Sequence, residues 1–138
     1  MVRRTFLIVI SMILIPVILV GCQSKDDVKV SNTEITKVSI SDSEGFANIN
    51  TDFFAVYKDE ETLETFKNVF ANAIKKPGVV DIIEPEFDLE VIYKDGNKQG
   101  YHLWLGEKDG RSTLMKLEDT HTIYSISEET NQLIDLIK

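Results

Sequence analysis

The stretch "FDLEVIYKDGNKQGYHLWL", residues 87–105, decides the fold. Apolar side chains occupy every second position of its first half: Phe87, Leu89, Val91 and Tyr93. Asp88, Glu90, Ile92 and Lys94 alternate with them, so one face is apolar and the other is mostly polar. Asp95-Gly96-Asn97 is a strong turn signal, and residues 100–105 form the returning run. The stretch therefore predicts an antiparallel hairpin with one face directed to the core.

The residues before the hairpin predict two strands and a helix. Residues 35–40 and 53–57 are short runs rich in β-branched or aromatic side chains, which is typical of strands. Asp59 offers an N-cap, and acidic residues follow it in the first turn. The apolar stripe behind this cap has helical spacing: Leu63, Phe66, Val69, Phe70, Ala73 and Ile74. We expect this helix to end at residues 75–78, and residues 79–86 to form a buried extended segment.

The residues after the hairpin predict two more strands and a last helix. Asp109-Gly110 marks a turn, and residues 113–117 and 122–126 are the expected strands. Residues 127–129 cap a helix, and its apolar side consists of Leu133, Ile134, Leu136 and Ile137. The fold class is therefore α+β: a single domain with a mainly antiparallel meander sheet, an amphipathic helix after the second strand and a C-terminal helix. Both helices are expected on one face of the sheet.

The N-terminus has the organisation of a secretory signal. Arg3 and Arg4 precede an uncharged, mainly apolar run over residues 6–21. This run is shorter than the roughly 20 residues that a transmembrane helix needs. We therefore expect residues 1–21 to be a removed signal peptide.

Leu19-Val20-Gly21-Cys22 resembles the lipobox of bacterial lipoproteins. The resemblance implies cleavage after Gly21 and a diacylglyceryl group, with palmitate-type acyl chains, on the sulfur of Cys22. A thiolate is nucleophilic enough for that alkylation, and two acyl chains hold a protein stably on a bilayer. The alternatives are a free buried cysteine or a signal cut elsewhere. The expected organisation is a signal over 1–21, a lipidated flexible tether over 22–34 and the α+β domain over 35–138.

Charge excludes some partners of the exported part. Removal of Arg3 and Arg4 with the signal takes the formal net charge from −8 to −10. Such a surface repels nucleic-acid phosphates and anionic lipid headgroups. The predicted link to the lipid bilayer is therefore diacylglyceryl-Cys22 alone, and the expected localisation is the cell membrane, facing outside.

Several short motifs of the domain resemble one known family. "PGVVDIIEPEFDLEV", "YHLWL" and "DTHTIYSIS", together with the lipobox, are similar to the YhfM-like lipoproteins of Gram-positive spore-forming bacteria. The resemblance covers most of residues 35–138 and implies a membrane-tethered extracytoplasmic domain. It brings no activity, cofactor or catalytic residue.

No common catalytic motif occurs in the sequence, so an enzyme is the less favoured class. His102 and His121 are expected on strands separated by another strand, and no metal or other cofactor is predicted. Glu86, Asp88 and Glu90 share one strand face. They are interpreted as a solvated face rather than as a calcium site or a catalytic carboxylate set.

Trp104 is the strongest binding candidate. Alternation places Trp104 and His102 opposite the core, and Ile92 lies on a neighbouring strand. An exposed aromatic patch of this kind would contact an envelope protein or a glycan, whereas the alternative is packing of Trp104 under a helix or a loop. The favoured function is a non-enzymatic, membrane-anchored binding module, too small for a two-domain solute receptor. The alternative is a small cell-envelope hydrolase that uses carboxylates.

Overall fold

The computed structural model describes residues 34–76 and 81–138. The predicted signal (1–21), Cys22 with Gly21, the tether up to residue 33, and Val79 and Val80 lie outside the described residues. In order along the described chain, the elements are β1 Ile35–Asp42, β2 Ala55–Tyr57, α1 Glu60–Asn72, β3 Ile74–Lys76, β4 Phe87–Tyr93, β5 Lys98–Trp104, β6 Ser112–Lys116, β7 Asp119–Ile126 and α2 Thr130–Ile137. No helix within these residues is long and apolar enough to span a membrane.

All strands of the described chain join one antiparallel sheet, in the order β2-β1-β4-β5-β6-β7-β3. Strands β4 to β7 follow one another as a meander, as predicted. Strand β1 adds to β4 on one side of the meander, and β3 adds to β7 on the other. The predicted α+β fold class is confirmed.

The hairpin of residues 87–105 forms with the predicted turn and the predicted apolar face. Leu89 lies opposite Tyr101, and Phe87 lies opposite Leu103, so the apolar positions of both strands share one face. At the turn Gly96 has a φ of 87°, a value that glycine adopts without steric cost. The backbone N–H of Asn97 donates to Asp95 Oδ1 at 2.9 Å, which fixes the turn.

Helix α1 begins as predicted and ends earlier than predicted. Asp59 Oδ1 accepts from the Thr62 N–H at 2.9 Å, which confirms the N-cap. The helix stops at Asn72, because the backbone of the next residues pairs with β7 as the edge strand β3. Ile74, expected on the buried helix stripe, is 58% exposed on that edge. A short strand whose apolar residue stays in water is invisible to periodicity.

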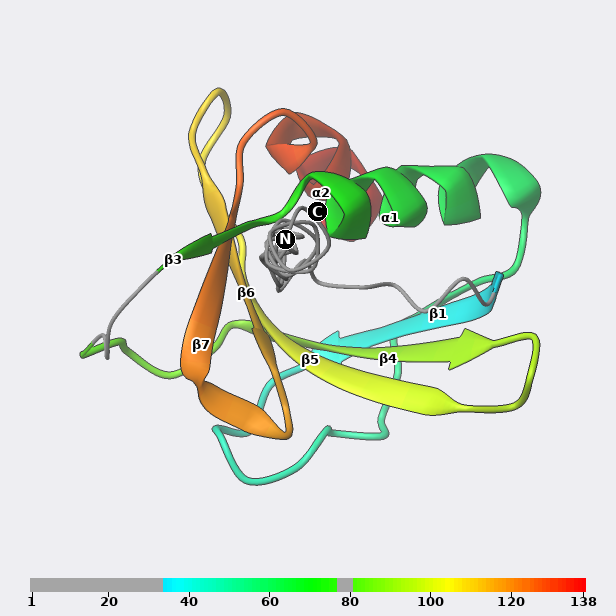
Figure 1. The fold of residues 1–138 in the computed structure, drawn as a ribbon, viewed down its shortest axis with the longest axis horizontal. Helices are drawn as coiled ribbons and strands as arrows, with labels where there is room; N and C mark the ends of the chain where they lie inside the picture. Colours follow the sequence, from blue (N-terminus) through cyan, green and yellow to red (C-terminus); the bar gives the residue numbers. More distant parts are fainter. Residues whose placement is uncertain (1–33, 77–80) are drawn as a thin grey trace, which may run out of the picture.

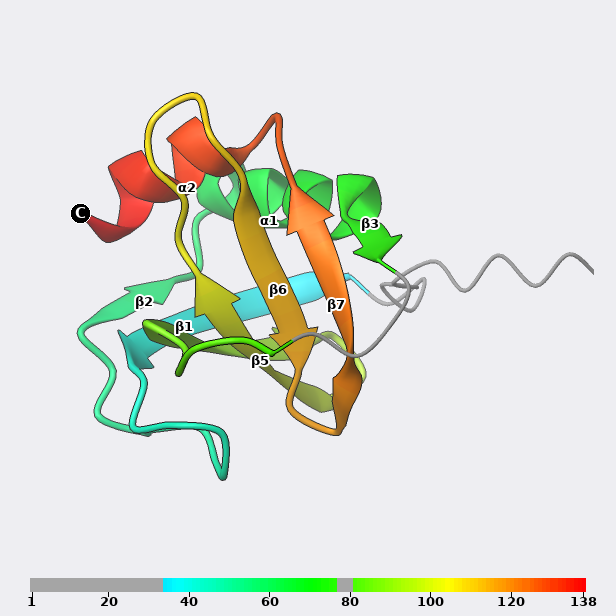
Figure 2. The same cartoon turned by 90° about the vertical axis from the view of Figure 1, so that its left-hand side faces the viewer.

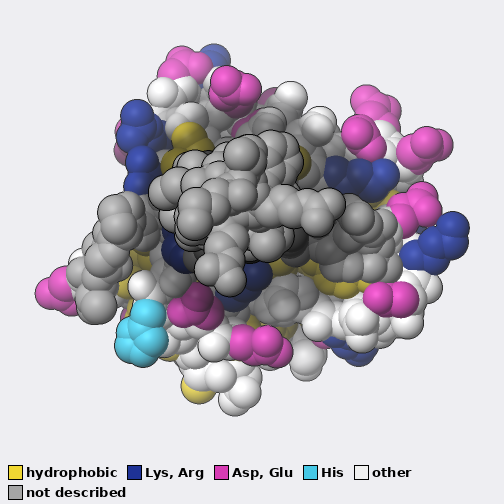
Figure 3. All heavy atoms as spheres, viewed as in Figure 1, with side chains coloured by type: hydrophobic (Ala, Val, Ile, Leu, Met, Phe, Trp, Pro, Cys, Tyr) yellow, Lys and Arg dark blue, Asp and Glu magenta, His cyan; other side chains and the backbone are white. Residues whose placement is uncertain are grey.

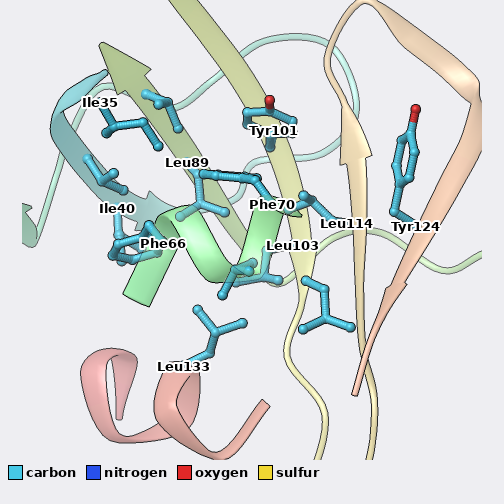
Figure 4. Packing of buried hydrophobic residues seen from close by; sticks show 14 of the residues in the cluster. Ile35, Ile40, Phe66, Phe70, Leu89, Tyr101, Leu103, Leu114, Tyr124 and Leu133 are labelled. Atoms are coloured by element: carbon cyan, nitrogen blue, oxygen red, sulfur yellow. The ribbon is translucent and has the colours of Figure 1, made fainter. Parts of the chain in front are cut away.

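Both helices cover the same face of the sheet (Figures 1 and 2), as expected. Between them and the sheet lies the core cluster, in which Phe70 of α1 stacks on Tyr101 with ring centroids 4.9 Å apart. Leu133 of α2 joins the same cluster (Figure 4). Apolar burial of this kind stabilises the fold by roughly 25 cal/mol per Å², and the apolar core cluster lies on this face.

Within residues 34–76 and 81–138, no helix lies on the opposite face of the sheet, and two irregular segments cover it. We call residues 43–54, between β1 and β2, the covering loop, and residues 81–86 the crossing segment. The crossing segment exists because the chain must pass from edge strand β3 to inner strand β4. The expectation that this run is buried is wrong for Ile83, which is 79% exposed, because its backbone and not its side chain contacts the sheet.

Candidate functional site

Strand β5 alternates as predicted, but its second face is not open. Tyr101 and Leu103 belong to the core cluster, whereas His102 and Trp104 point to the other face. There His102 is 0% and Trp104 9% exposed. The prediction that Trp104 and His102 form an exposed patch is therefore wrong, and the alternative of packing under a loop is correct for Trp104; His102 is buried as well. The covering loop and the crossing segment bury these two side chains, and the alternation of β5 by itself does not predict such a contact.

Trp104 is held by the backbone of the crossing segment. Its Nε1–H lies 2.8 Å from the carbonyl oxygen of Ile83 and 3.0 Å from that of Glu84. The ring of Phe46, from the covering loop, lies 6.0 Å from the Trp104 ring, centroid to centroid. A buried indole requires such an acceptor for its N–H. Trp104 is thus the point where both covering segments meet the sheet.

Ile92, the third predicted binding residue, lies apart from Trp104. It is half-buried on β4 and pairs with Lys98 at the start of β5. Trp104 lies at the other end of β5, about 20 Å along the strand at 3.3 Å per residue. The three residues therefore do not form one patch.

Asp88 and His102 form a buried pair on the covered face. Each is 0% exposed, and Asp88 Oδ1 lies 2.8 Å from His102 Nδ1. The predicted solvated face is wrong at Asp88, because the covering loop closes over it. The Asn50 N–H of that loop donates to Asp88 Oδ2 at 2.9 Å. Nε2 of His102 lies 3.3 Å from the Phe46 carbonyl oxygen.

The partners of His102 imply where its hydrogens are. A carbonyl oxygen only accepts, so Nε2 carries a hydrogen toward Phe46. A second hydrogen must lie between Nδ1 and Asp88 Oδ1, on one atom or the other. The pair therefore holds one shared proton, and its polar atoms are bonded to loop backbone as well as to each other. Its evident role is to fasten the covering loop to the sheet.

The strand order does not build a nucleophilic relay from these side chains. Ser41, Asp88 and His102 lie opposite one another on β1, β4 and β5, so the carboxylate stands between the hydroxyl and the imidazole. In a serine relay the imidazole stands in the middle and takes the hydroxyl proton. Here Ser41 Oγ donates instead to the Asn50 carbonyl oxygen at 2.6 Å. The geometry supports fastening rather than nucleophilic attack.

The other two predicted carboxylates, Glu86 and Glu90, have different surroundings. Glu86 Oε2 accepts from the Leu105 N–H at 2.8 Å, and half-buried Glu90 faces Ser39 across β1 and β4. His121 is exposed on β7, with β6 between it and β5. In residues 34–76 and 81–138, no group of three His, Cys, Asp or Glu side chains is placed to hold a metal ion.

What remains exposed beside Trp104 is a small apolar surface. Phe46 is 36% and Ile83 79% exposed, and both contact Trp104, one through its ring and the other through its backbone. The Ser43 N–H donates to the Glu86 carbonyl oxygen at 3.0 Å, which joins the two covering segments. We call Phe46 and Ile83, with Trp104 beneath them, the Phe46–Ile83 surface.

Comparison with known proteins assigns the chain to a family. Residues 31–138 match the YhfM protein family. The chain belongs to the YhfM family. This match confirms the family resemblance of the motifs within residues 31–138, and it covers the whole described domain of this YhfM-family chain. No curated protein sequence matches the chain.

A solved structure shares the fold of this YhfM-family domain. A thioesterase-like protein from Clostridium sporogenes is similar over 75% of this chain and 94% of its own, with a TM-score of 0.60 and 17% sequence identity. At that identity the likeness concerns the fold alone.

In the sequence of this YhfM-family chain, neither Phe46 nor Ile83 stands out as a binding residue, for two different reasons. Phe46 follows Gly45 within a polar stretch, so no periodicity singled it out. Ile83 belongs to an apolar run that indicates burial. The signal that pointed to this region was Trp104, which lies directly beneath both.

Proposed function

We propose that this chain is a lipid-anchored extracytoplasmic module that binds a protein partner through the Phe46–Ile83 surface. The acyl anchor is diacylglyceryl-Cys22, the localisation is the outer face of the cell membrane, and the activity is non-enzymatic. The observation that carries the proposal is the exposure of two large apolar side chains on one fixed platform, Trp104.

Fixed presentation is what distinguishes this surface from scattered exposed apolar residues, which are common. The backbone of Ile83 is bonded to the indole of Trp104, and the backbone of Phe46 lies against His102. The backbone that carries each side chain is therefore fixed before a partner arrives, so binding costs less backbone conformational entropy. Central aromatic and aliphatic anchors of this type dominate the energetics of protein interfaces.

The predicted anchor suits such a role. The tether from Cys22 to Glu34 spans at most about 40 Å when fully extended. That length lets the domain turn its second face toward a neighbour in or near the membrane. Tethering also raises the effective concentration of any membrane-bound partner.

A small envelope hydrolase is the alternative function. Its supporting observation is the Asp88–His102 contact, which also occurs in acid–base catalysis. Catalysis would require the covering loop to open, because both residues are fully buried. The binding function needs no such movement, and we favour it for that reason.

Site-specific photo-crosslinking in cells tests the binding function. A photoreactive side chain at exposed Ala47, beside Phe46, is expected to give a discrete crosslinked product. The same side chain at Glu61, on the helical face, is the control and is expected to give none of that product. Ile83→Asp, introduced with the Ala47 probe, is expected to abolish the product. Equal products from both positions, or a product that survives Ile83→Asp, would contradict the proposal.

A further inference from the structure

The two segments that cover the second face are unusually one-sided in charge. The covering loop and the crossing segment together contain five carboxylates and no lysine or arginine: Glu44, Asp52, Asp81, Glu84 and Glu86. All 15 lysine and arginine residues of the chain lie outside these two segments, and Figure 3 shows acidic and basic side chains near one another around much of the rim of the molecule. The acidic character of the covering segments is therefore a local feature and does not follow from the overall net charge alone.

Two of these carboxylates flank the Phe46–Ile83 surface. Glu44 precedes Phe46 by two residues, and Glu84 follows Ile83 directly; both side chains are exposed. Glu84 Oε1 lies 4.0 Å from the position that a Cβ would take on Gly45, so the Glu84 carboxylate lies beside the residue that follows Glu44. Neither forms a salt bridge with another residue of the described chain. Unpaired charges around an apolar centre set the partner that fits.

From this arrangement we infer that the partner is a basic, apolar protein segment, with one or two large apolar side chains flanked by lysine or arginine. The inference rests on the proposed function and names its partner class. Its apolar side chains would pack on Phe46 and Ile83, and its cations would lie near Glu44 and Glu84. An anionic lipid surface is repelled by the same carboxylates. A second copy presents the same acidic segments and is repelled as well.

Trp104 is the only tryptophan of the chain, so its fluorescence reports on this surface. The full chain, in uncharged detergent micelles, is titrated with three peptides of about twelve residues without tryptophan. The peptides share the same Leu and Phe positions and carry Lys, Gln or Glu between them. We expect the Lys peptide to shift Trp104 emission in a saturable manner and the Glu peptide to have no effect. Raising salt from about 0.05 M to 0.5 M is expected to weaken the Lys peptide several-fold.

Charge variants locate the effect. Glu44→Gln with Glu84→Gln is expected to weaken the Lys peptide about 2- to 5-fold per carboxylate. The matched control, Glu118→Gln with Glu128→Gln, removes the same charge from exposed positions outside both covering segments and is expected to change nothing.

Equal affinity of the Lys and Gln peptides, or an effect of the control equal to that of Glu44→Gln with Glu84→Gln, overturns the basic partner and leaves the binding function intact. Absence of binding by all three peptides also overturns it. The proposed function falls as well only if the Ala47 crosslink is missing, is matched by an equal product at Glu61, or survives Ile83→Asp.

Discussion

At the residue scale, buried polar side chains hold the covering loop on the sheet. Asp88 and His102 are buried between the sheet and the covering loop, and each bonds both to the other and to loop backbone. Buried ion pairs are often no more stabilising than apolar residues of the same volume, but losing one partner is costly. The sequence showed a polar residue at each position and gave no sign that the two meet.

Asp88→Ala is expected to destabilise the fold by about 3–5 kcal/mol, because it leaves His102 and the Asn50 N–H without their acceptor. The free energy of unfolding is measured by urea denaturation of the full chain. Asp81→Ala, at an exposed position, serves as the control and is expected to stay within about 0.5 kcal/mol of the unmodified protein. If Asp88→Ala lowers the free energy of unfolding by less than about 1 kcal/mol, the pair does not hold the covering loop on the sheet.

A second effect at the residue scale is the raised pKa of two buried tyrosines, Tyr93 and Tyr101. Burial raises the pKa of Tyr101 well above its ordinary value, and the nearby Tyr93 raises it further. Burial also raises the pKa of Tyr93, although its hydrogen bond with Tyr101 acts in the opposite sense. Figure 4 shows the hydroxyls of Tyr101 and Tyr124 directed to the same end of the cluster, away from α2. The core therefore requires the phenols of Tyr93 and Tyr101 to stay neutral.

The raised pKa values predict alkaline instability. In the unfolded chain a tyrosine loses its proton near pH 10, whereas folded Tyr93 and Tyr101 keep theirs to higher pH. The stabilisation is complete below pH 10 and is lost as the pH rises above it. Tyrosinate absorbance should show fewer ionised tyrosines in the folded protein than in urea at the same pH. In Tyr101→Phe with Tyr93→Phe this difference should shrink; superimposable titrations of the unmodified protein in the two states would refute the assignment.

At the element scale the covering loop behaves as the second layer of the domain. Its Ile49 packs where β5 has no side chain: a Cβ on Gly100 would lie 2.8 Å from Ile49 Cγ1 and 3.1 Å from Leu117 Cδ2. Because Gly100 has no side chain, β5 leaves a space there, and Ile49 of the covering loop fills it. A glycine within a strand often marks such a close approach.

Gly100→Ala is expected to lift the covering loop and cost about 1–3 kcal/mol, because Ile49 must move. Amide hydrogen exchange should accelerate at Asn50, whose N–H bonds Asp88, more than at Leu103 in the core strand. Ile49→Ala added to Gly100→Ala removes the atoms that collide and is expected to restore part of the loss. If the double variant is no better than Gly100→Ala, the loop is not what meets the new methyl group.

At the scale of the whole molecule, one sheet is covered on both faces by different means. Helices α1 and α2 bury the apolar face, and the covering loop and crossing segment bury a polar face fastened by hydrogen bonds (Figure 2). The proposed binding surface lies on the second layer, which the covering loop and the crossing segment form. A partner there would meet the domain without disturbing its main core.

Cys22→Ser is expected to remove the acyl anchor and, with it, signal cleavage at Gly21. Metabolic labelling with a palmitate analogue should mark the unmodified protein and leave the variant unlabelled. In Gram-positive cells the unmodified protein should fractionate with membranes and be accessible to protease added outside. Ser24→Ala, next to the lipobox, is the control and should be labelled normally. Labelling of Cys22→Ser would contradict the anchor.

The parts of the fold that followed from sequence are those with local causes. The 87–105 hairpin has its alternation and its Asp95-Gly96-Asn97 turn, and α1 has its cap and stripe. The end of α1 was not predicted, because Ile74–Lys76 becomes a strand only by pairing with β7, which lies some fifty residues later. Pairing over such a distance leaves no pattern in the short strand itself.

By itself, the sequence determined the fold class, the family and the side of β5 on which Trp104 lies, because periodicity and turn residues act over a few positions. Only the tertiary structure decided that this side is closed, that Asp88 meets His102, and that Phe46 and Ile83 stay exposed beside the buried Trp104. The physical reason is that strand order forces two irregular segments across the second face. Their backbone groups must find partners there, and these contacts join residues far apart in the chain.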